Sequence, residues 1–580
     1  MNRHLSNSAL FFIILALLTI CYFPQLMNSE LLGDDIWRIA ELSGLTFSQV
    51  LSTELADRPL LITSIWFEHN ILQLPFGALR FVNILLLSLI SVFIRKLAVV
   101  MLELQGDKTK EWVLCTVAIL FALHPLHTQT VGHIVQRGIL IAGLGSVLAT
   151  YFLIKSKFEI KSRYWCYAIV LWGLALLSKP NVIFFLGFWV ILIVSFYEKN
   201  KLKSLIPFFL AILIPICFYK IGGFNSQQAE GAISPFDYFL IQGKVIPLYF
   251  KLIIYPVGLK FNHDIVINPQ SPFYLGLIFW FLLVTLNLLI LYLVKNRLLK
   301  LALLSISLSF LPESSFFPII HTIFEHRTFF PILFIALSMM LIHWPTKLFI
   351  KWIASVLISS FAVLIFSRSY DVRNFRSWAR EEVSHTCNLS YLSFYIAGQF
   401  FLRNDINSVN YTLESLRKCP NLNTTLIQSI VSLKSLYSKE VITYKDLSEI
   451  KSIIHSDNLM TPPIRNVFNN VIQNKLLSLS DKSLSPCLIE DFGSVQLKVA
   501  RQNPRSYKSL IQSYKKASSD CLATRLPQEK EYYRELRIRA IRVAYFGEQD
   551  SSLKSEIESK GSDVRLEELL ALIENGPYFK

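Results

Sequence analysis

Charged side chains are scarce in this chain. Asp, Glu, Lys and Arg make up 17% of its 580 residues, whereas 53% of the residues are hydrophobic. A soluble protein of this size would have about a quarter of its residues charged. The scarcity excludes an ordinary water-soluble globular protein. Apolar runs of about 18 residues recur through the first two thirds of the chain and are long enough to cross a bilayer as helices.

A small-residue cleavage pattern is also missing after the first apolar run. That run, residues 9–22, is short and is followed by Pro24 and Gln25. A secretory signal peptide would end in a small-residue site. We therefore expect this segment to be retained as the first membrane helix.

The net charge of +16 suggests nucleic acid at first, but its placement argues against that partner. The Lys and Arg residues cluster in short segments between apolar runs. Short loops rich in Lys and Arg mark the cytoplasmic side of a membrane protein. The clusters lie at 95–110, 155–163, 199–203, 295–300 and 347–351.

The alternation of apolar runs and basic clusters predicts an all-α polytopic membrane bundle of about 11 spans. The predicted spans are 9–22, 78–95, 112–125, 138–154, 164–178, 182–197, 205–221, 273–294, 299–312, 328–344 and 348–366. Segment 239–257 is apolar as well, but Lys244, Pro247, Lys251 and Pro256 interrupt it. We interpret it as a re-entrant or interfacial element.

The last third of the chain lacks any long apolar run and shows mixed charge with helical periodicity. We therefore divide the chain into a transmembrane domain, 1–368, and a helical domain, 369–580, which lies outside the cytoplasm by the parity of the spans. An even number of cysteines there is compatible with two disulfides, and unpaired cysteines buried in helices are the alternative. These cysteines are Cys387, Cys419, Cys487 and Cys521.

Acidic, histidine and isolated basic residues gather in the predicted outward segments. An ionisable residue at membrane depth is a functional hypothesis, because its burial is unfavourable. A carboxylate can take a proton from a hydroxyl group or hold a metal, and Lys or Arg can neutralise a phosphate. The candidates are Asp34, Asp35, Arg58, His124, His127, Arg137, Lys179, His263, Asp264, Glu325, His326 and Arg327.

Each candidate also has a purely structural interpretation. Asp34 and Asp35 could lie in a solvated loop or cap a helix. The spacing of His124 and His127 resembles a metal pair, but no second pair completes a zinc site, which favours a hydrogen-bonding or phosphate-binding role. Interfacial snorkelling is the alternative for Arg137 and Lys179. Glu325 and Arg327 could form a local ion pair, and His263 could be structural.

Several short motifs resemble those of one family. The strings ALHPLHTQTV at 122–131 and QRGIL at 136–140 resemble the HPxHTExV and GRxxLL motifs of membrane-embedded O-mannosyltransferases with lumenal tetratricopeptide repeats, and of their bacterial relatives. Further matches follow in order along residues 25–390. They are RPL at 58–60, FVNILL at 81–86, LSK at 177–179, YPVGL at 255–259, NHD at 262–264, FEHRTFFP at 324–331, and Arg373, Asn374 and Trp378.

The resemblance implies a GT-C fold with a polyprenyl- or dolichyl-phosphate sugar donor. Under it, Asp34 or Asp35 is the catalytic or acceptor-orienting carboxylate. The groups around the donor phosphate would be His124, His127, Arg137, Lys179 and Arg327. Arg58, His263, Asp264, Glu325 and His326 would support them. A divalent cation, Mg or Mn, stays open as a cofactor.

The chain departs from the family pattern at three places. Gln129 stands where Glu is usual, Pro180 follows Lys179 where an acid is common, and Phe329 and Phe330 replace a Tyr-Leu pair. The C-terminal domain also lacks a clear repeat of about 34 residues, so its tetratricopeptide-like character is an analogy.

The sequence therefore predicts a glycosyltransferase of the bacterial inner membrane with a periplasmic active site and C-terminal domain. It would move one sugar to a Ser or Thr hydroxyl of an exported protein, such as a type IV pilin, docked on the C-terminal domain. A glycan or lipid acceptor is the first alternative, and a lipid-linked-sugar transporter comes from a different class. Sequons at Asn388, Asn410 and Asn423 leave a eukaryotic source open.

Overall fold

A computed structural model gives the structure of the chain. It describes residues 6–28, 30–33, 35, 38–39, 42, 45–52, 58–107, 111–213, 234–260, 263, 274–316, 323–345, 348–385, 396–397, 400, 405–417, 430–431 and 434–435. The chain divides into two compact units, Met1–Thr386 and Cys387–Lys580.

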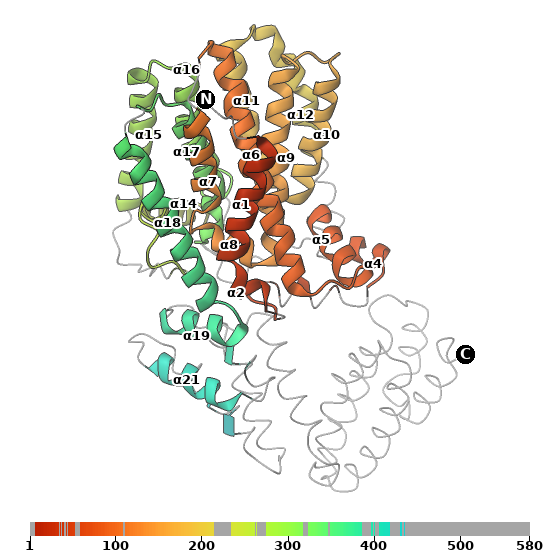
Figure 1. Cartoon of the computed structure of the whole chain (residues 1–580), viewed down its shortest axis with the longest axis vertical. Helices are drawn as coiled ribbons and strands as arrows, with labels where there is room; N and C mark the ends of the chain where they lie inside the picture. Colours follow the sequence, from red (N-terminus) through yellow and green to blue (C-terminus); the bar gives the residue numbers. More distant parts are fainter. Residues whose placement is uncertain are drawn as a thin grey trace, which may run out of the picture. The chain divides into compact units, whose positions relative to one another are not determined.

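Every regular element within the described residues is a helix, which confirms the predicted all-α class (Figure 1). The longer helices of the first unit are α1 (Asn7–Cys21), α6 (Phe76–Gln105), α7 (Glu111–Ala122), α9 (Arg137–Lys155), α10 (Arg163–Ser178), α11 (Phe185–Phe196), α14 (Pro235–Ile254), α15 (Tyr274–Leu293), α16 (Arg297–Phe310), α17 (Phe329–Leu341), α18 (Leu348–Asp371) and α19 (Phe375–His385). Shorter helices connect them: α2 (Phe23–Leu26), α4 (Phe47–Ser52), α5 (Pro59–Trp66), η2 (Phe67–Ile71), α8 (His127–Gly132), η3 (Ile134–Gln136), η4 (Pro180–Phe184), η5 (Lys199–Leu205), α12 (Ile206–Leu210) and η6 (Glu325–Thr328).

Four helical segments among the described residues are long and apolar enough to cross a membrane: α6, the combined η3 and α9, α15, and α18. On α15, apolar side chains face outward, and Phe281 and Tyr292 are 70% and 85% exposed. Apolar surface of this kind suits contact with lipid. The predicted spans over α1, α7, α10 and α11 coincide with apolar helices of 10–17 residues, and their crossing of the membrane stays a prediction.

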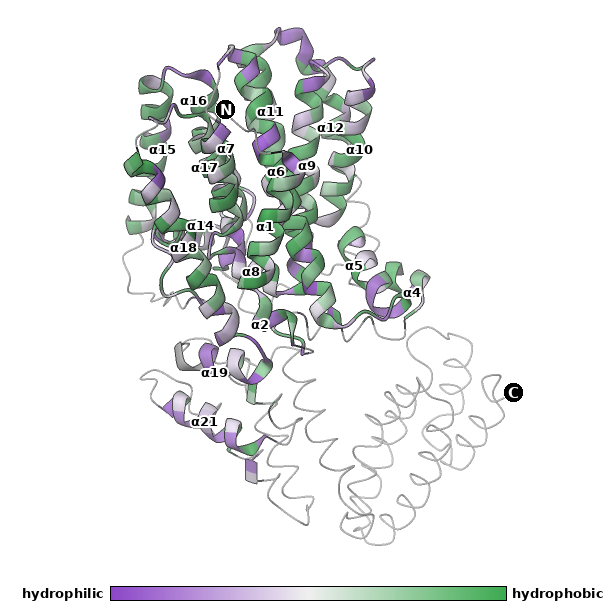
Figure 2. Cartoon of the chain, viewed as in Figure 1, coloured by the Kyte–Doolittle hydropathy of each residue, from purple (hydrophilic) through white to green (hydrophobic). Residues whose placement is uncertain are grey.

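The basic segments lie together at one end of the helices. Lys201 Nζ lies 3.4 Å from Glu159 Oε1, and an Arg297 guanidinium N–H donates to the Ser195 carbonyl at 3.2 Å. Figure 2 shows hydrophilic residues near the helix ends and hydrophobic residues along the helix lengths. This is the pattern of a bundle whose sides face an apolar environment.

Segment 239–257 is helical as far as Ile254. That part belongs to α14, a continuous helix with Pro247 in its interior, although the sequence predicted an interrupted element. Pro256 follows the end of this helix. The interpretation of the segment as re-entrant or interfacial stays a prediction. Helix α14 crosses α15 closely at Gly243. A Cβ atom there would approach the Gly276 carbonyl oxygen to 2.3 Å, so this close backbone approach needs glycine.

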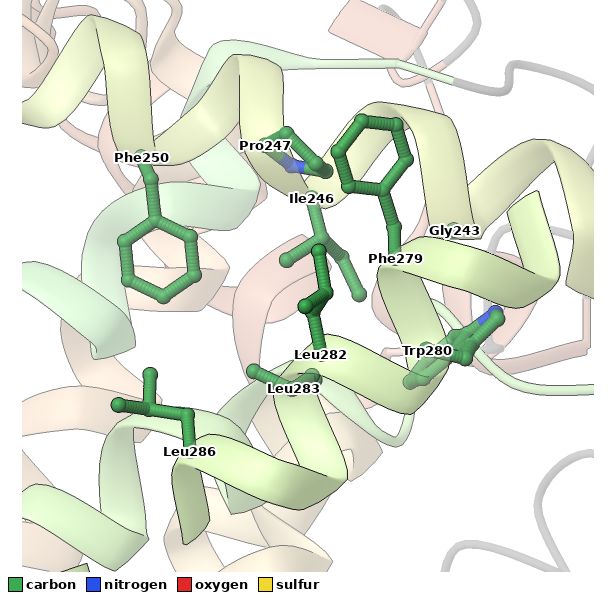
Figure 3. Close-up of a pocket in the computed structure, with 9 residues that line it drawn as sticks. All are labelled: Gly243, Ile246, Pro247, Phe250, Phe279, Trp280, Leu282, Leu283 and Leu286. Carbon is green, nitrogen blue, oxygen red and sulfur yellow. The ribbon is translucent and has the colours of Figure 1, made fainter. Parts of the chain in front are cut away.

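An apolar groove lies beside this crossing, between α14 and α15 (Figure 3). Its volume is about 280 Å³. The residues that line it are Gly243, Ile246, Pro247 and Phe250 of α14, and Phe279, Trp280, Leu282, Leu283 and Leu286 of α15. The α14 positions follow a spacing of three and four residues and therefore share one face of that helix.

Two predicted regions lie largely outside the described residues. Of the seventh predicted span, 205–221, only residues up to 213 are described, including α12. In the second unit, α21 (Ile406–Arg417) is an amphipathic helix that buries Leu413 and Leu416. The tetratricopeptide-like arrangement and the cysteines at 387, 419, 487 and 521 lie outside the described residues. Helix α18 crosses the predicted boundary at 368 and α19 lies beyond it, and both belong to the first unit.

Candidate functional site

The helix bundle brings the predicted site residues to the end opposite the basic loops. Arg137 begins α9, which ends at Lys155 in a basic loop. Lys179 follows the last residue of α10, a helix that starts at Arg163 among basic residues. Arg327 lies in η6, directly before α17. Because successive helices run in opposite directions, side chains far apart in the sequence meet here.

Asp35 anchors the first loop to the start of the α9 segment. Its two carboxylate oxygens accept hydrogen bonds from the backbone N–H groups of Ile134 and Val135, both at 2.9 Å, and its side chain is fully buried. Burial raises the pKa of the Asp35 carboxyl, although nearby His133 and Arg80 and the two amides act in the opposite direction. Asp35 therefore has the contacts of a helix N-cap.

Arg137 is engaged within the protein. Its guanidinium pairs with Glu68 Oε2 at 2.7 Å and donates to Asn83 Oδ1 at 3.0 Å and to the Leu79 carbonyl at 2.8 Å. These contacts join α9 to α6 and η2. They favour a structural role for Arg137 over the predicted contact with a donor phosphate, which stays a prediction.

Arg80 completes this group, and the sequence did not single it out. Its guanidinium donates to the backbone carbonyls of Gln25, Asn28 and Gly132 at 3.3, 3.1 and 3.1 Å. We call Asp35, Glu68, Arg80, Asn83 and Arg137 the anchor cluster. The signal for Arg80 was a cation inside an apolar run, and for Asn83 its place in the FVNILL motif.

The buried ion pair of the anchor cluster gives a stability prediction. Glu68→Ala leaves Arg137, which is 1% exposed, without its counter-charge. Loss of one partner of a buried ion pair destabilises a protein by about 3 to 5 kcal/mol. We expect the variant to have a clearly lower midpoint of thermal unfolding than wild type. The midpoint is measured by protein fluorescence on the detergent-solubilised protein. The control is Glu159→Ala in the exposed pair with Lys201, for which we expect a change within about 0.5 kcal/mol. Equal midpoints for the two variants would contradict the buried pairing.

Two buried cations share the carboxylate of Glu313. Lys179 Nζ lies 3.1 Å from Glu313 Oε1, and Arg327 Nε lies 3.8 Å from Glu313 Oε2. Asn181 donates to Glu313 Oε1 at 3.2 Å, and the Tyr238 hydroxyl donates to the Glu313 backbone carbonyl at 2.7 Å. We call Lys179, Arg327 and Glu313 the cation cluster. Glu313 directly follows the predicted span 299–312, and the sequence analysis did not predict it as a site residue.

The environment of the cation cluster shifts its ionisation. Burial lowers the pKa of Lys179 to about 8 even though Glu313 acts to raise it, and Arg58 and Arg327 lower it further. For Glu313, burial acts to raise the pKa, but Lys179, Arg327 and Arg58 together prevail and the pKa is lowered. Glu313 is therefore ionised at neutral pH, and Lys179 loses its charge at a lower pH than an exposed lysine.

His326 and Gln129 make a second contact next to this cluster. Gln129 Oε1 accepts from the His326 backbone N–H at 2.7 Å and lies 3.2 Å from His326 Nδ1. Burial lowers the pKa of His326, and Lys179, Arg327 and Arg58 lower it further, so the ring is neutral at pH 7. A neutral ring that donates through Nδ1 to the amide oxygen leaves Nε2 as a hydrogen-bond acceptor.

Glu325 and His124 contact other parts of the first unit, whereas His127 is surrounded by aromatic rings. Glu325 Oε1 lies 2.9 Å from His263 Nε2. His124 Nε2 lies 3.0 Å from the Ile253 carbonyl oxygen, which ties this loop to α14. His127 packs between the rings of Phe121 and Phe329, and neither of its ring nitrogens has a hydrogen-bond partner within the described residues.

The described residues include no group of three or more His, Cys, Asp or Glu side chains that could hold a metal ion. Most of the predicted site residues lie at one end of the bundle, in several distinct groups of contacts. They are Asp35, Arg58, His124, His127, Arg137, Lys179, His263, Glu325, His326 and Arg327. Asp34 and Asp264 lie outside the described residues.

Comparison of the chain with protein-family models, with curated proteins and with solved structures finds no match. The family resemblance therefore rests on the motifs, and the function has to be argued from the geometry of the site.

Proposed function

We propose that the chain is a membrane-embedded glycosyltransferase that moves one sugar from a polyprenyl-phosphate donor to a Ser or Thr hydroxyl of an exported protein. The observation that carries this proposal is the pair of buried cations Lys179 and Arg327, at 5% and 6% exposure, at the ends of apolar helices. Such cations suit an anionic headgroup attached to a lipid.

Helix α14 links the cation cluster to a place for the lipid tail. On one face, its Tyr238 donates to the Glu313 backbone, and its Tyr249 hydroxyl accepts from the Phe324 N–H at 3.1 Å. On the other face lie Ile246, Pro247 and Phe250 of the apolar groove (Figure 3). A phosphate among the cations and an isoprenoid tail in the groove would lie on two sides of one helix.

The orientation follows from charge. The basic loops lie opposite the cation cluster, and Lys- and Arg-rich loops stay in the cytoplasm. The proposed active site is therefore extracytoplasmic, in the bacterial inner membrane. The C-terminal unit would dock the protein acceptor, in keeping with the sequence analysis.

The proposed reaction is a single displacement. A carboxylate of the first loop takes the proton from the acceptor hydroxyl, whose oxygen attacks the anomeric carbon of the sugar. The bond from that carbon to the phosphate oxygen breaks, and polyprenyl phosphate leaves with one more negative charge than it had in the diester. Lys179 and Arg327 would stabilise this developing charge in a site of low dielectric constant. The configuration at the anomeric carbon is inverted.

The two aspartates have different roles in this proposal. Each carboxylate oxygen of Asp35 accepts a backbone N–H, so that Asp35 holds the loop against the α9 segment. The proton acceptor is therefore Asp34, its neighbour in the sequence. Arg137 and Glu68 support the same loop through η3 and α6.

The mass of exported proteins tests the function directly. We expect intact proteins from a strain that expresses the chain to carry an added sugar mass that is absent from a deletion strain. A mass difference on a protein such as a pilin supports protein O-glycosylation. A difference confined to lipid or polysaccharide assigns the alternative acceptor, and no difference in any of these fractions contradicts the transferase.

The lowered pKa of Lys179 gives a pH prediction. Because Lys179 is charged below about pH 8 and neutral above it, kcat/KM for the lipid donor should fall as the pH rises through that value. The guanidinium of arginine stays protonated over this range, so Lys179→Arg should remove the fall while it lowers the maximum. An unchanged alkaline limb in Lys179→Arg would show that another group titrates.

A further inference from the structure

Glu313 occupies the place between the two cations that an anion would take. Its two carboxylate oxygens lie toward Lys179 Nζ at 3.1 Å and toward Arg327 Nε at 3.8 Å. A phosphate binds cations through oxygens in the same way. The carboxylate therefore lies against the two cationic groups that a bound phosphate would contact, and the site as it stands holds an internal anion.

Three features allow the carboxylate to leave this place. Its side chain is 16% exposed, whereas those of Lys179 and Arg327 are 7% and 4% exposed, so Glu313 lies on the accessible side of the cluster. The contact with Arg327 is longer than the 2.7–2.9 Å typical of a charge-assisted hydrogen bond. The Tyr238 hydroxyl holds the Glu313 backbone carbonyl, which lets the side chain rotate while the loop keeps its position.

We propose that Glu313 is an internal competitor for the donor phosphate: its carboxylate bridges Lys179 and Arg327 in the empty enzyme and is displaced when the lipid phosphate binds. This inference rests on the proposed function, because it assumes that the cation cluster receives a phosphate. Glu313 is then a positioning residue for the two cations. The affinity for the donor depends on how strongly the Glu313 carboxylate binds them in the empty state.

The competition has a measurable consequence. A buried cation left without its carboxylate gains more from a phosphate, so the isosteric Glu313→Gln should bind the phosphate more tightly. The Gln side chain keeps hydrogen-bonding capacity toward Lys179 and Asn181 while it removes the negative charge. Because the empty state of this variant loses its charged contact with the cations, we expect about a tenfold gain in affinity, which corresponds to about 1.4 kcal/mol.

The experiment uses the full chain in detergent and polyprenyl monophosphate without a sugar as the probe. Affinity is measured by titration near neutral pH for wild type, Glu313→Gln and the distant control Glu159→Gln. We expect Glu313→Gln to bind about tenfold more tightly than wild type. The control should bind as wild type does, and Lys179→Met should bind more weakly than either.

A pH series separates competition from a general effect on the fold. Glu313 acts to raise the pKa of Lys179, so its removal shifts the loss of Lys179 charge to lower pH. The tighter binding by Glu313→Gln should therefore shrink as the pH rises toward 8 and above. A change in folding alone would not make the difference in affinity between Glu313→Gln and wild type depend on pH in this way.

The outcomes are distinguishable. In one outcome, wild type binds the probe, Lys179→Met does not, and folded Glu313→Gln binds no more tightly than wild type. This outcome overturns the competitor role of Glu313 and leaves the proposed function standing. No binding of the probe by wild type or by Glu313→Gln overturns both. If Glu313→Gln does not fold, Glu313→Asp replaces it: its shorter carboxylate should give a smaller gain in affinity, and no gain overturns the inference.

Discussion

Lys179→Met is expected to reduce sugar transfer by about two to three orders of magnitude, the loss seen when one donor that stabilises developing negative charge is removed. Methionine preserves the length and apolar stem of the lysine, so the α10 to η4 turn keeps its packing. The missing ammonium removes one of the two cations that contact Glu313. The rate is measured as kcat/KM with the purified protein and a lipid-phosphate sugar, once mass analysis has identified the sugar.

Lys155→Met is the matched control for this variant. Lys155 lies at the basic end, its side chain is 40% exposed, and it makes a 4.0 Å contact with Glu103. Surface pairs of this kind contribute little, so its activity should equal that of wild type. A similar loss in both variants would indicate a general effect of lost positive charge, and full activity in Lys179→Met would remove the phosphate site from the mechanism.

The two aspartates of the first loop should respond differently to replacement by asparagine. Asp34→Asn removes the proposed proton acceptor, and loss of general base catalysis lowers rates by about 10² to 10⁴ fold. Thermal stability should stay that of wild type. Asp35→Asn leaves one acceptor oxygen for two backbone N–H groups, and its amide donors face one of them. A buried donor left unsatisfied destabilises by about 1 to 3 kcal/mol.

The measurement is the pair of values for each variant: the transfer rate and the midpoint of thermal unfolding. Loss of activity in Asp34→Asn at normal stability, with lowered stability in Asp35→Asn, supports the division of roles. Full activity of both variants at wild-type expression would end the proposed mechanism. A large stability loss in Asp34→Asn and none in Asp35→Asn would reverse the assignment.

The helices could be located from the sequence because apolar runs and basic clusters alternate. The span predicted at 138–154 is α9, Arg137–Lys155, and the span at 273–294 is α15, Tyr274–Leu293. Helix α6 runs past the predicted end at 95 to Gln105, because Arg95 is paired with Glu111 and Asn7 and stays within a helix. Arg95 therefore lies at the predicted end of the span, but the helix continues past it.

Helix α14 shows where local rules failed. Pro247 removes one backbone donor and usually breaks a helix interior, which is why the sequence predicted an interrupted element. Its ring lies on the groove face of the helix, while Tyr238 and Tyr249 are buried on the opposite face. α14 is continuous, and its buried face makes tertiary contacts. No local sequence pattern reveals those contacts.

The pairings within the site could not be predicted either. The sequence identified Lys179 and Arg327 as cations beside the membrane, but their common partner Glu313 lies in another loop. Likewise, the partners of Arg137 come from η2 and α6, and no spacing rule connects them. The ionisable residue types, and the end of the bundle at which they lie, can be predicted from the sequence, whereas the choice of partner depends on how the helices pack.

Within the described residues, the apolar groove is lined by α14 and α15 and is open along its side, and α15 exposes apolar residues such as Leu288 and Leu291. The proposed lipid donor could therefore enter the groove laterally from the surrounding lipid leaflet and would not have to leave the membrane. Only the isoprene units next to the phosphate would contact protein, and the remainder of the chain would stay among the phospholipids. Under the proposed function, the rate of sugar transfer should consequently not depend on the total length of the carrier, and a donor with a truncated prenyl chain should replace the natural one.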